Sequence, residues 1–245
     1  MSEETTSNTI RIETLFPEIA NLYGDHANIR YLKLCVPDAE YVSDALSEEP
    51  RFVTERPDML YMGPLTERKQ ELVIEKLRPY TGRLIELIEQ DVLFLITGNA
   101  MEIFFDAIEK EDGTRIEGLG IFHYIARRKM FNRYNSGIMG MFEDIRLVGF
   151  KSQFTHAYGD NSQEYFMQVS KGDGLNRESR LEGIRRNRFF GTYILGPILI
   201  LNPDFCLYIQ KALGVENPQL IYEDAVRDAY EERVRQYEAT EFVLY

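Results

Sequence analysis

The stretch Val92–Ala100, with the sequence VLFLITGNA, decides the fold of this chain. Its first residues form an apolar run with the length and composition of a buried strand. The run breaks at Gly98, directly after Thr97, and leads into a helix-like stretch. A second segment, Gly191–Pro197 (GTYILGP), again combines a short apolar run with glycines. The first segment therefore predicts a strand that ends in a sharp turn.

The segments before this strand alternate between short apolar strands and helices. Pro37 ends one helix, because the residue before a proline disfavours helical geometry, and Thr66 caps the start of another. Such alternation is typical of a mainly parallel α/β sheet with helices on its faces. The predicted elements are strands at 8–15, 40–42 and 59–62, and helices at 24–35, 66–77 and 83–90.

The pattern changes after a helix predicted at 100–108. Asp112-Gly113 is a hairpin turn signal. Strand-like runs follow at 121–125, 137–142 and 165–170. These runs predict a small, mostly antiparallel β insertion in the α/β domain.

The C-terminal part is predicted to be a charged helix with an apolar stripe at every fourth position. The stripe packs on the domain or contacts a second copy or another partner. Its residues are Tyr222, Val226, Tyr230 and Val234.

Composition excludes several classes of function. The 245 residues carry a formal net charge of −12, which opposes binding to nucleic acid or to an anionic membrane. Longer apolar runs are interrupted by glycine and proline, so no membrane span is expected. Cys35 and Cys206 are predicted to be small buried residues without a disulfide framework. A reducing cytoplasm is the expected location, with residues 1–9 a disordered lead.

Several short motifs occur in a fixed order from Ile12 to about Leu213. They are Asn21–Asp25 with Asn28-Ile29, Asp58–Gly63, the turn around Thr97, Gly113-Thr114 with Glu117–Ile121, Val148–Phe150, Gly191–Tyr193 and Gly196-Pro197. In this order and spacing the chain resembles class I glutamine amidotransferases. The similarity is to the cobyric acid synthase type and to the glutaminase subunit of lipid II isoglutaminyl synthase. The resemblance implies a three-layer α/β fold with its cleft beside Gly63, Thr97 and Leu195.

The resemblance also places Thr97 where the family has its nucleophilic Cys, and Leu195 where it has its catalytic His. A glutaminase needs a thiolate to attack the side-chain amide and an imidazole to move the protons. The hydroxyl of Thr97 is hardly ionised near neutral pH, and Leu195 cannot act as a base. These two positions predict that glutamine hydrolysis is absent.

Four further positions of the same cleft depart from the family pattern. The oxyanion loop contains Pro64, which has no N–H to donate. Met101 replaces a Gln that helps to hold the substrate. Gln153 and His156 stand where a His and an Arg are usual. The predicted pocket residues are therefore Gly63, Pro64, Thr97, Gly98, Met101, Gln153, His156 and Leu195.

Other candidates for chemistry have simpler interpretations. His26, His123 and His156 are scattered and lack the spacing of metal ligands, and only His156 is predicted to face the pocket. Glu102 and Asp106 share one face of the predicted helix, where a salt-bridging surface role is favoured over a place in the cleft. No cofactor and no metal are expected.

We interpret the chain as a glutamine amidotransferase-like domain at 10–215 followed by a helical extension at 216–245. The first hypothesis is a pseudo-glutaminase that acts as a binding or regulatory subunit. The resemblance implies a Mur-ligase-like or other synthetase subunit as its partner, with self-association as an alternative. The second hypothesis is an enzyme or small-molecule-binding protein with a remodelled pocket. The third is a divergent active amidotransferase of the cell-wall or cobyric acid type.

Overall fold

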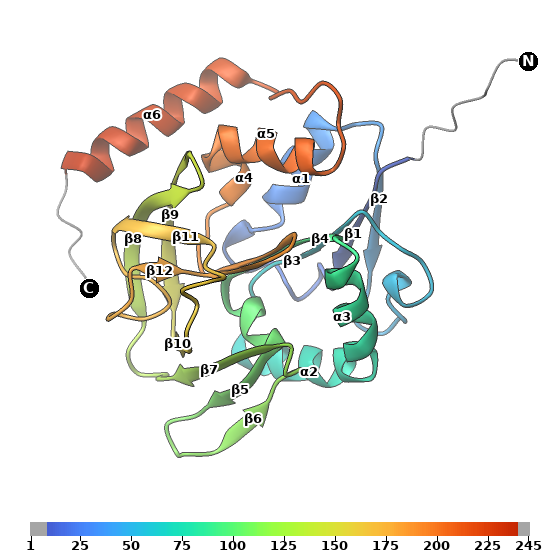
Figure 1. Ribbon diagram of the computed structural model, residues 1–245, viewed down its shortest axis with the longest axis vertical. Coiled ribbons are helices and arrows are strands. Elements are labelled where there is room, and N and C mark those ends of the chain that lie inside the picture. Colours follow the sequence, from blue (N-terminus) through green and yellow to red (C-terminus); the bar gives the residue numbers. More distant parts are fainter. Residues whose placement is uncertain (1–8, 240–245) are drawn as a thin grey trace, which may run out of the picture.

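A central six-stranded sheet organises the computed structural model, which describes residues 9–239 (Figure 1). The strand order is β13-β14-β4-β3-β1-β2. All neighbouring strands are parallel except β13 and β14. The strands are β1 Arg11–Leu15, β2 Glu40–Asp44, β3 Met59–Met62, β4 Leu93–Thr97, β13 Ile184–Arg186 and β14 Phe189–Thr192. The lead predicted at 1–9 lies almost wholly outside the described residues.

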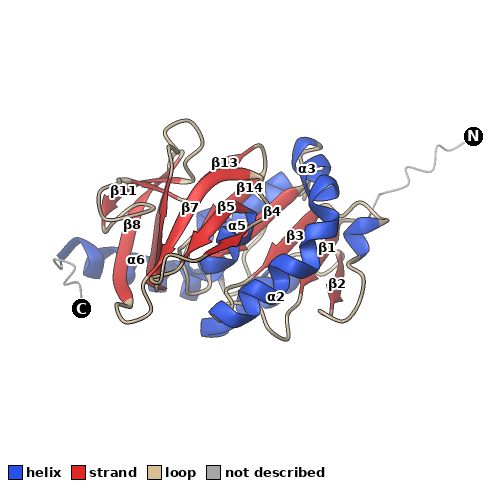
Figure 2. Ribbon diagram, turned by 90° about the horizontal axis from the view of Figure 1, so that it is seen from below, coloured by secondary structure: helices blue, strands red, loops and turns tan. Residues whose placement is uncertain are grey.

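Helices cover both faces of this sheet, which gives the three-layer α/β architecture expected from the sequence (Figures 1 and 2). In β3, Leu60 and Met62 face α2 and α3, whereas Met59 and Tyr61 face α1 and α5. This alternation follows from the two-residue period of a strand. The helices are α1 Ala27–Cys35, α2 Glu67–Leu77, α3 Thr81–Glu89, α4 Ile198–Leu201 and α5 Pro203–Ala212.

The β insertion between β4 and β13 forms two further four-stranded sheets. One has the order β10-β7-β5-β6 and the other the antiparallel order β12-β11-β8-β9. The predicted turn at Gly113, with a φ of 81°, joins β5 to β6. The strands are β5 Phe105–Glu109, β6 Arg115–Glu117, β7 Phe122–Arg128, β8 Tyr134–Phe142, β9 Ile145–Gln153, β10 Thr155–Tyr158, β11 Met167–Lys171 and β12 Leu181–Glu182.

The helix predicted at 100–108 is wrong. The chain forms a 3₁₀ helix, η4, at Gly98–Phe104 and then enters strand β5. Phe104, the last residue of η4, and Phe105, the first of β5, are both fully buried in the core that includes side chains of the central sheet. Burial on all sides removes the one-sided pattern that distinguishes a helix from a strand.

The C-terminal helix α6, Glu223–Ala239, lies across α4, α5 and β9 (Figure 1). Val226 packs against the core, and the hydroxyl of Tyr230 donates to the carbonyl of Arg146 at 2.9 Å. Part of the predicted apolar stripe therefore packs on the domain, while Tyr222 remains 74% exposed. Within residues 9–239, no helix is both long and apolar enough to cross a membrane.

Two buried carboxyl groups meet between β1 and β2. Glu13 is fully buried and Asp44 is 2% exposed. One oxygen of Glu13 accepts the N–H of Phe52 at 2.9 Å, and the other is buried without a hydrogen-bond donor among residues 9–239, close to the Asp44 carboxyl group. Burial, followed by the neighbouring Asp44, raises the pKa of Glu13 to about 9. Glu13 is therefore protonated near neutral pH.

Candidate functional site

A cavity of about 260 Å³ lies beside the carboxyl ends of β3 and β4, where parallel α/β sheets commonly bind ligands. Four of the predicted pocket residues line it: Pro64, Gly98, Gln153 and Leu195. The rest of the lining comes from Leu22, Tyr23, Leu65, Thr66, Glu67, Asn99, Arg133, Ser152, Phe154, Thr155 and Tyr193.

The Thr97 hydroxyl points into the protein rather than into this cavity. Thr97 is fully buried, and its Oγ1 donates to Oδ2 of Asp25 at 2.5 Å. The same carboxyl oxygen accepts the hydroxyl of Tyr61 at 2.6 Å. Burial raises the pKa of Asp25, while the hydrogen bonds from Thr97 and Tyr61 act in the opposite direction. The proton of the Thr97 hydroxyl is thus engaged in a buried hydrogen bond to Asp25.

Apolar side chains cover the turn after Thr97. Gly98 has a φ of +60°, a left-handed conformation that glycine adopts without strain. A Cβ at this position would lie 2.6 Å from Cβ of Pro64 and 3.0 Å from Cδ2 of Leu195. Leu195 is only 2% exposed, and its N–H donates to the carbonyl of Phe150 at 2.9 Å. Pro64 and Leu195 therefore close over the strand end.

Two neighbouring positions of the loop after β3 offer no free backbone donor. Pro64 has no N–H, and the N–H of Leu65 donates to Oδ1 of Asn99 at 2.9 Å. The Asn99 side chain returns a hydrogen bond to the carbonyl of Leu65 at 2.8 Å. This reciprocal pair fixes the loop, but it occupies the donor that an oxyanion would need.

Glu102 is fully buried beneath the cavity, so the surface role favoured for it is wrong. Its carboxylate accepts the hydroxyl of Tyr193 at 3.0 Å and the side-chain amide of Gln70 at 2.8 Å. The buried guanidinium of Arg128 donates to Gln70 at 2.5 Å. Asp106, which was predicted to share a helix face with Glu102, lies on β5 instead, 3.3 Å from Nδ1 of His123.

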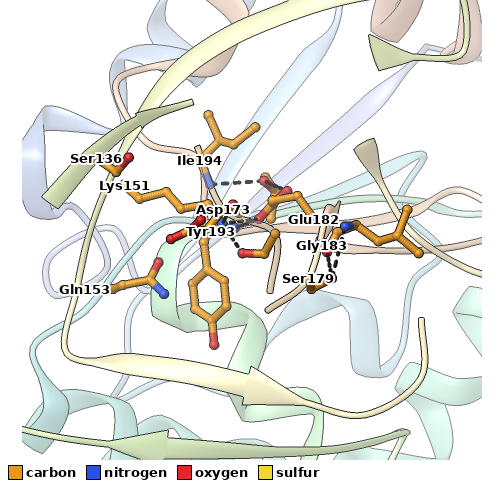
Figure 3. A network of polar contacts seen from close by, with 12 residues as sticks. Ser136, Lys151, Gln153, Asp173, Ser179, Glu182, Gly183, Tyr193 and Ile194 are labelled. Atoms are coloured by element: carbon orange, nitrogen blue, oxygen red, sulfur yellow. Dashed lines mark hydrogen bonds and ion pairs between the residues drawn. The ribbon is translucent and has the colours of Figure 1, made fainter. Parts of the chain in front are cut away.

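A second buried network stands on the other side of Tyr193 (Figure 3). Nζ of Lys151, 1% exposed, lies 3.6 Å from Oε1 of the fully buried Glu182. The ammonium also donates to the carbonyls of Asp173 and Gly174, at 3.0 and 2.6 Å. Burial lowers the pKa of Lys151, and Glu182 acts against that change.

The carboxylate of Glu182 in turn holds the end of β14. It accepts the N–H of Tyr193 and the hydroxyl of Thr192, each at 2.8 Å. The segment that resembles the family's histidine strand is therefore fixed by a buried ion pair.

Polar groups remain available inside the cavity. Gln153 is 6% exposed; its Nε2 donates to the carbonyl of Thr155 at 2.5 Å, and its buried Oε1 has no hydrogen-bond partner among residues 9–239. At the other end of the lining, the Arg133 guanidinium donates to the hydroxyls of Tyr23 and Ser152.

The remaining predicted pocket residues lie outside the cavity lining. Gly63 approaches the carbonyl of Ala20, and Met101 is buried against Gly191. His156 lies on β10 beside the ring of Tyr134, with ring centroids 5.1 Å apart. Burial and the charge of Lys151 lower the pKa of His156 to about 4, so it is neutral near pH 7.

Asp25 is the main site residue that sequence reasoning missed. Gly24-Asp25 with Asn28 fits a helix start, and that interpretation hid the carboxyl group beneath Thr97. Its polar neighbours come from three elements. Asn28 of α1 donates to the Asp25 carbonyl at 3.0 Å, and the hydroxyls of Tyr61 on β3 and Thr97 on β4 donate to the Asp25 carboxyl group. In the described part of the chain, no group of three or more His, Cys, Asp or Glu side chains could hold a metal ion.

Sequence comparison finds relatives along most of the chain, although no family model matches. The chain is 26% identical over 224 residues to the GatD subunit of lipid II isoglutaminyl synthase (glutamine-hydrolyzing) from Streptococcus pneumoniae, covering 88% of this chain and 86% of that protein. It is 28% identical over 192 residues to the Staphylococcus aureus GatD subunit, covering 77% and 78%.

Solved structures show the same fold. A glutamine amidotransferase crystal structure matches with a TM-score of 0.55 and 11% identity, covering 83% of this chain and 99% of that one. A glutamine amidotransferase from Thermotoga maritima matches with a TM-score of 0.52 and 10% identity, covering 94% and 93%.

Proposed function

As a member of the class I glutamine amidotransferase-like family, this chain is, we propose, a pseudo-glutaminase: a subunit that does not hydrolyse glutamine. The observation that carries the proposal is the state of Thr97, whose hydroxyl is fully buried and donates to Asp25 at 2.5 Å. A nucleophile must reach the substrate carbon and needs an adjacent base that faces the same space. Here the hydroxyl is directed away from the cavity.

The surroundings of Thr97 support the same proposal. Leu195 carries no titratable group, and its side chain covers Gly98 together with Pro64. The Leu65 N–H, the next donor along the loop, is bound to Asn99. Amide hydrolysis requires a nucleophile, a base and an oxyanion donor. Here the Thr97 hydroxyl and its Asp25 partner are buried away from the cavity, Leu195 offers no base, and Pro64 and Leu65 offer no free N–H.

The partner we propose is a Mur-ligase-like synthetase subunit. The two GatD relatives are subunits of lipid II isoglutaminyl synthase by name. Their similarity extends over at least 77% of this chain, so a shared way of assembly is a reasonable inheritance even where the chemistry has been lost. In such an assembly the chain acts through binding.

Ammonia release from glutamine is expected to stay at the level of the buffer blank, alone and with the purified synthetase subunit. The reason is that no described group facing the cavity can replace the thiolate and imidazole. Release is measured with a glutamate dehydrogenase coupled assay, and the Streptococcus pneumoniae GatD complex serves as the positive control. Ammonia release that disappears in Thr97→Ala would overturn the proposal and favour a divergent active amidotransferase.

A small molecule bound in the cavity is the second candidate, favoured by the unpartnered Oε1 of Gln153. A buried acceptor left without a donor costs stability, and a ligand N–H or O–H would satisfy it. We expect a set of metabolites that includes glutamine to contain a ligand for this cavity. At one hundred times its Kd, such a ligand would raise the free energy of unfolding by about 2.7 kcal/mol.

Gln153→Met is the variant for this second candidate, because it keeps the length of the side chain and removes the Oε1 acceptor, although it also removes the Nε2 donor to Thr155. Thermal unfolding with and without each metabolite is the measurement. The stabilisation should disappear in the variant. If no metabolite of the set shifts the unfolding temperature of the native chain, the result counts against a ligand.

A further inference from the structure

The turn between β7 and β8 exposes apolar side chains close to the cavity. Phe131 is 93% exposed and Met130 is 42% exposed. The turn itself is closed by a hydrogen bond from the N–H of Asn132 to the carbonyl of Lys129 at 3.2 Å. We call residues 129–133 the basic aromatic turn.

Contacts at its base hold the basic aromatic turn in place. The N–H of Lys129 donates to the carbonyl of Phe154 at 2.7 Å, and the guanidinium of Arg133 lies 4.2 Å from the centre of the Phe154 ring. Arg133 also donates to Ser152 at 3.2 Å and to the hydroxyl of Tyr23. A side chain presented on a fixed backbone binds at a lower entropic cost than one on a loose loop.

The local charge is opposite to that of the whole chain. Between Glu117 and Glu143 the sequence contains no Asp or Glu, whereas Lys129 and Arg133 flank the exposed Phe131. The guanidinium of Arg177 lies 5.5 Å from the centre of the Tyr134 ring, whose hydroxyl donates to the carboxylate of Asp173 at 2.7 Å. On a chain with a net charge of −12, this is a basic surface with an aromatic tip.

We propose that the basic aromatic turn docks a partner protein whose surface offers an apolar pocket bordered by carboxylates. Phe131 is the anchor that fills the pocket, and Lys129 and Arg133 orient the encounter. An anionic membrane fits less well, because the remainder of the chain would be repelled. This docking surface rests on the proposed function, because a subunit requires a partner. It adds the place of contact, which lies beside Arg133 at the cavity.

Site-specific photo-crosslinking in the organism that encodes the chain tests the docking surface. A benzophenone amino acid replaces Phe131, or Leu34 and Tyr222 as exposed controls at 52% and 74%. One discrete adduct from position 131, absent at position 34, is expected. Adducts from position 222 alone, or none at any position, would overturn the proposal.

Binding of the purified adduct partner to the native chain then gives the decisive measurement. Phe131→Ala and Lys129→Glu are each expected to raise the Kd at least tenfold, and Leu34→Ala to leave it unchanged. The Lys129 effect should shrink at high salt. An unchanged Kd in Phe131→Ala, or Phe131-dependent flotation with phosphatidylglycerol vesicles, overturns the docking proposal.

The identity of the captured protein separates this inference from the proposed function. A Mur-ligase-like synthetase with the expected Kd changes supports both. A different protein with the same changes supports the basic aromatic turn and removes the synthetase as partner. A synthetase complex that is insensitive to Phe131 leaves the subunit role standing and rejects the turn.

Discussion

Replacing Lys151 by Met is expected to lower the free energy of unfolding by about 3–5 kcal/mol. The ammonium and the Glu182 carboxylate are 1% and 0% exposed, so the variant leaves a buried anion without its cation. It also removes the donor to the carbonyls of Asp173 and Gly174. Urea unfolding of both proteins measures the loss, provided that the free energy of unfolding depends on urea concentration with the same slope in both.

The double variant Lys151→Met with Glu182→Gln is the matched control. It removes both charges while the glutamine oxygen keeps an acceptor for the N–H of Tyr193. Much of the lost stability should return, because the cost of the single variant comes mainly from the unpaired charge. A loss below about 1 kcal/mol in Lys151→Met would show that water reaches Glu182 and that the pair is not a buried one.

Glu13 is expected to make the free energy of unfolding of the native chain fall as the pH rises. The Glu13→Gln variant is expected to abolish this contribution. The pKa of Glu13 is raised from 4.5 to about 9 in the folded chain, first by burial and then by Asp44. The folded state therefore retains a proton that the unfolded state releases. This stabilisation is fully present below pH 4.5 and is lost as the pH rises towards 9, with a slope of at most about 1.4 kcal/mol per pH unit.

The glutamine variant has no titrating proton. Its oxygen can accept the N–H of Phe52 as Glu13 does at 2.9 Å, and its amide group can donate to the neighbouring Asp44. Chemical unfolding of both proteins between pH 5 and pH 9 gives the comparison. The stability of the variant should exceed that of the native chain increasingly towards pH 9. Parallel curves would mean that folded Glu13 does not keep its proton near neutral pH.

The fold was largely predictable because its signals are local. Short apolar strands such as Met59–Met62 appear where expected, and Thr66 Oγ1 accepts the N–H of Lys69 at 3.4 Å as the predicted helix cap. The failure at 100–108 has a non-local cause. The strand Phe105–Glu109 is selected by its pairing with β6 and β7, and those partners cannot be identified from the segment itself.

The candidate site was predictable at the positions that carry the family resemblance, and much less so around them. Pro64, Gly98 and Leu195 do meet at one cavity. Glu102 was placed on the surface because charged residues are rarely buried without partners. Its partner Tyr193 lies 91 positions away in the sequence, and only the folded chain brings them together.

Tyr193 connects three separate segments of the fold through its own contacts. Its N–H binds Glu182, its hydroxyl binds Glu102, and its ring lies 5.6 Å from Nζ of Lys151. One residue at the end of the central sheet thereby joins β9, β12 and η4. None of these segments can open alone without breaking a buried hydrogen bond or ion pair, so their amide hydrogens should exchange through one shared, rare opening. The contacts of Tyr193 thus make this part of the cavity wall one cooperative unit.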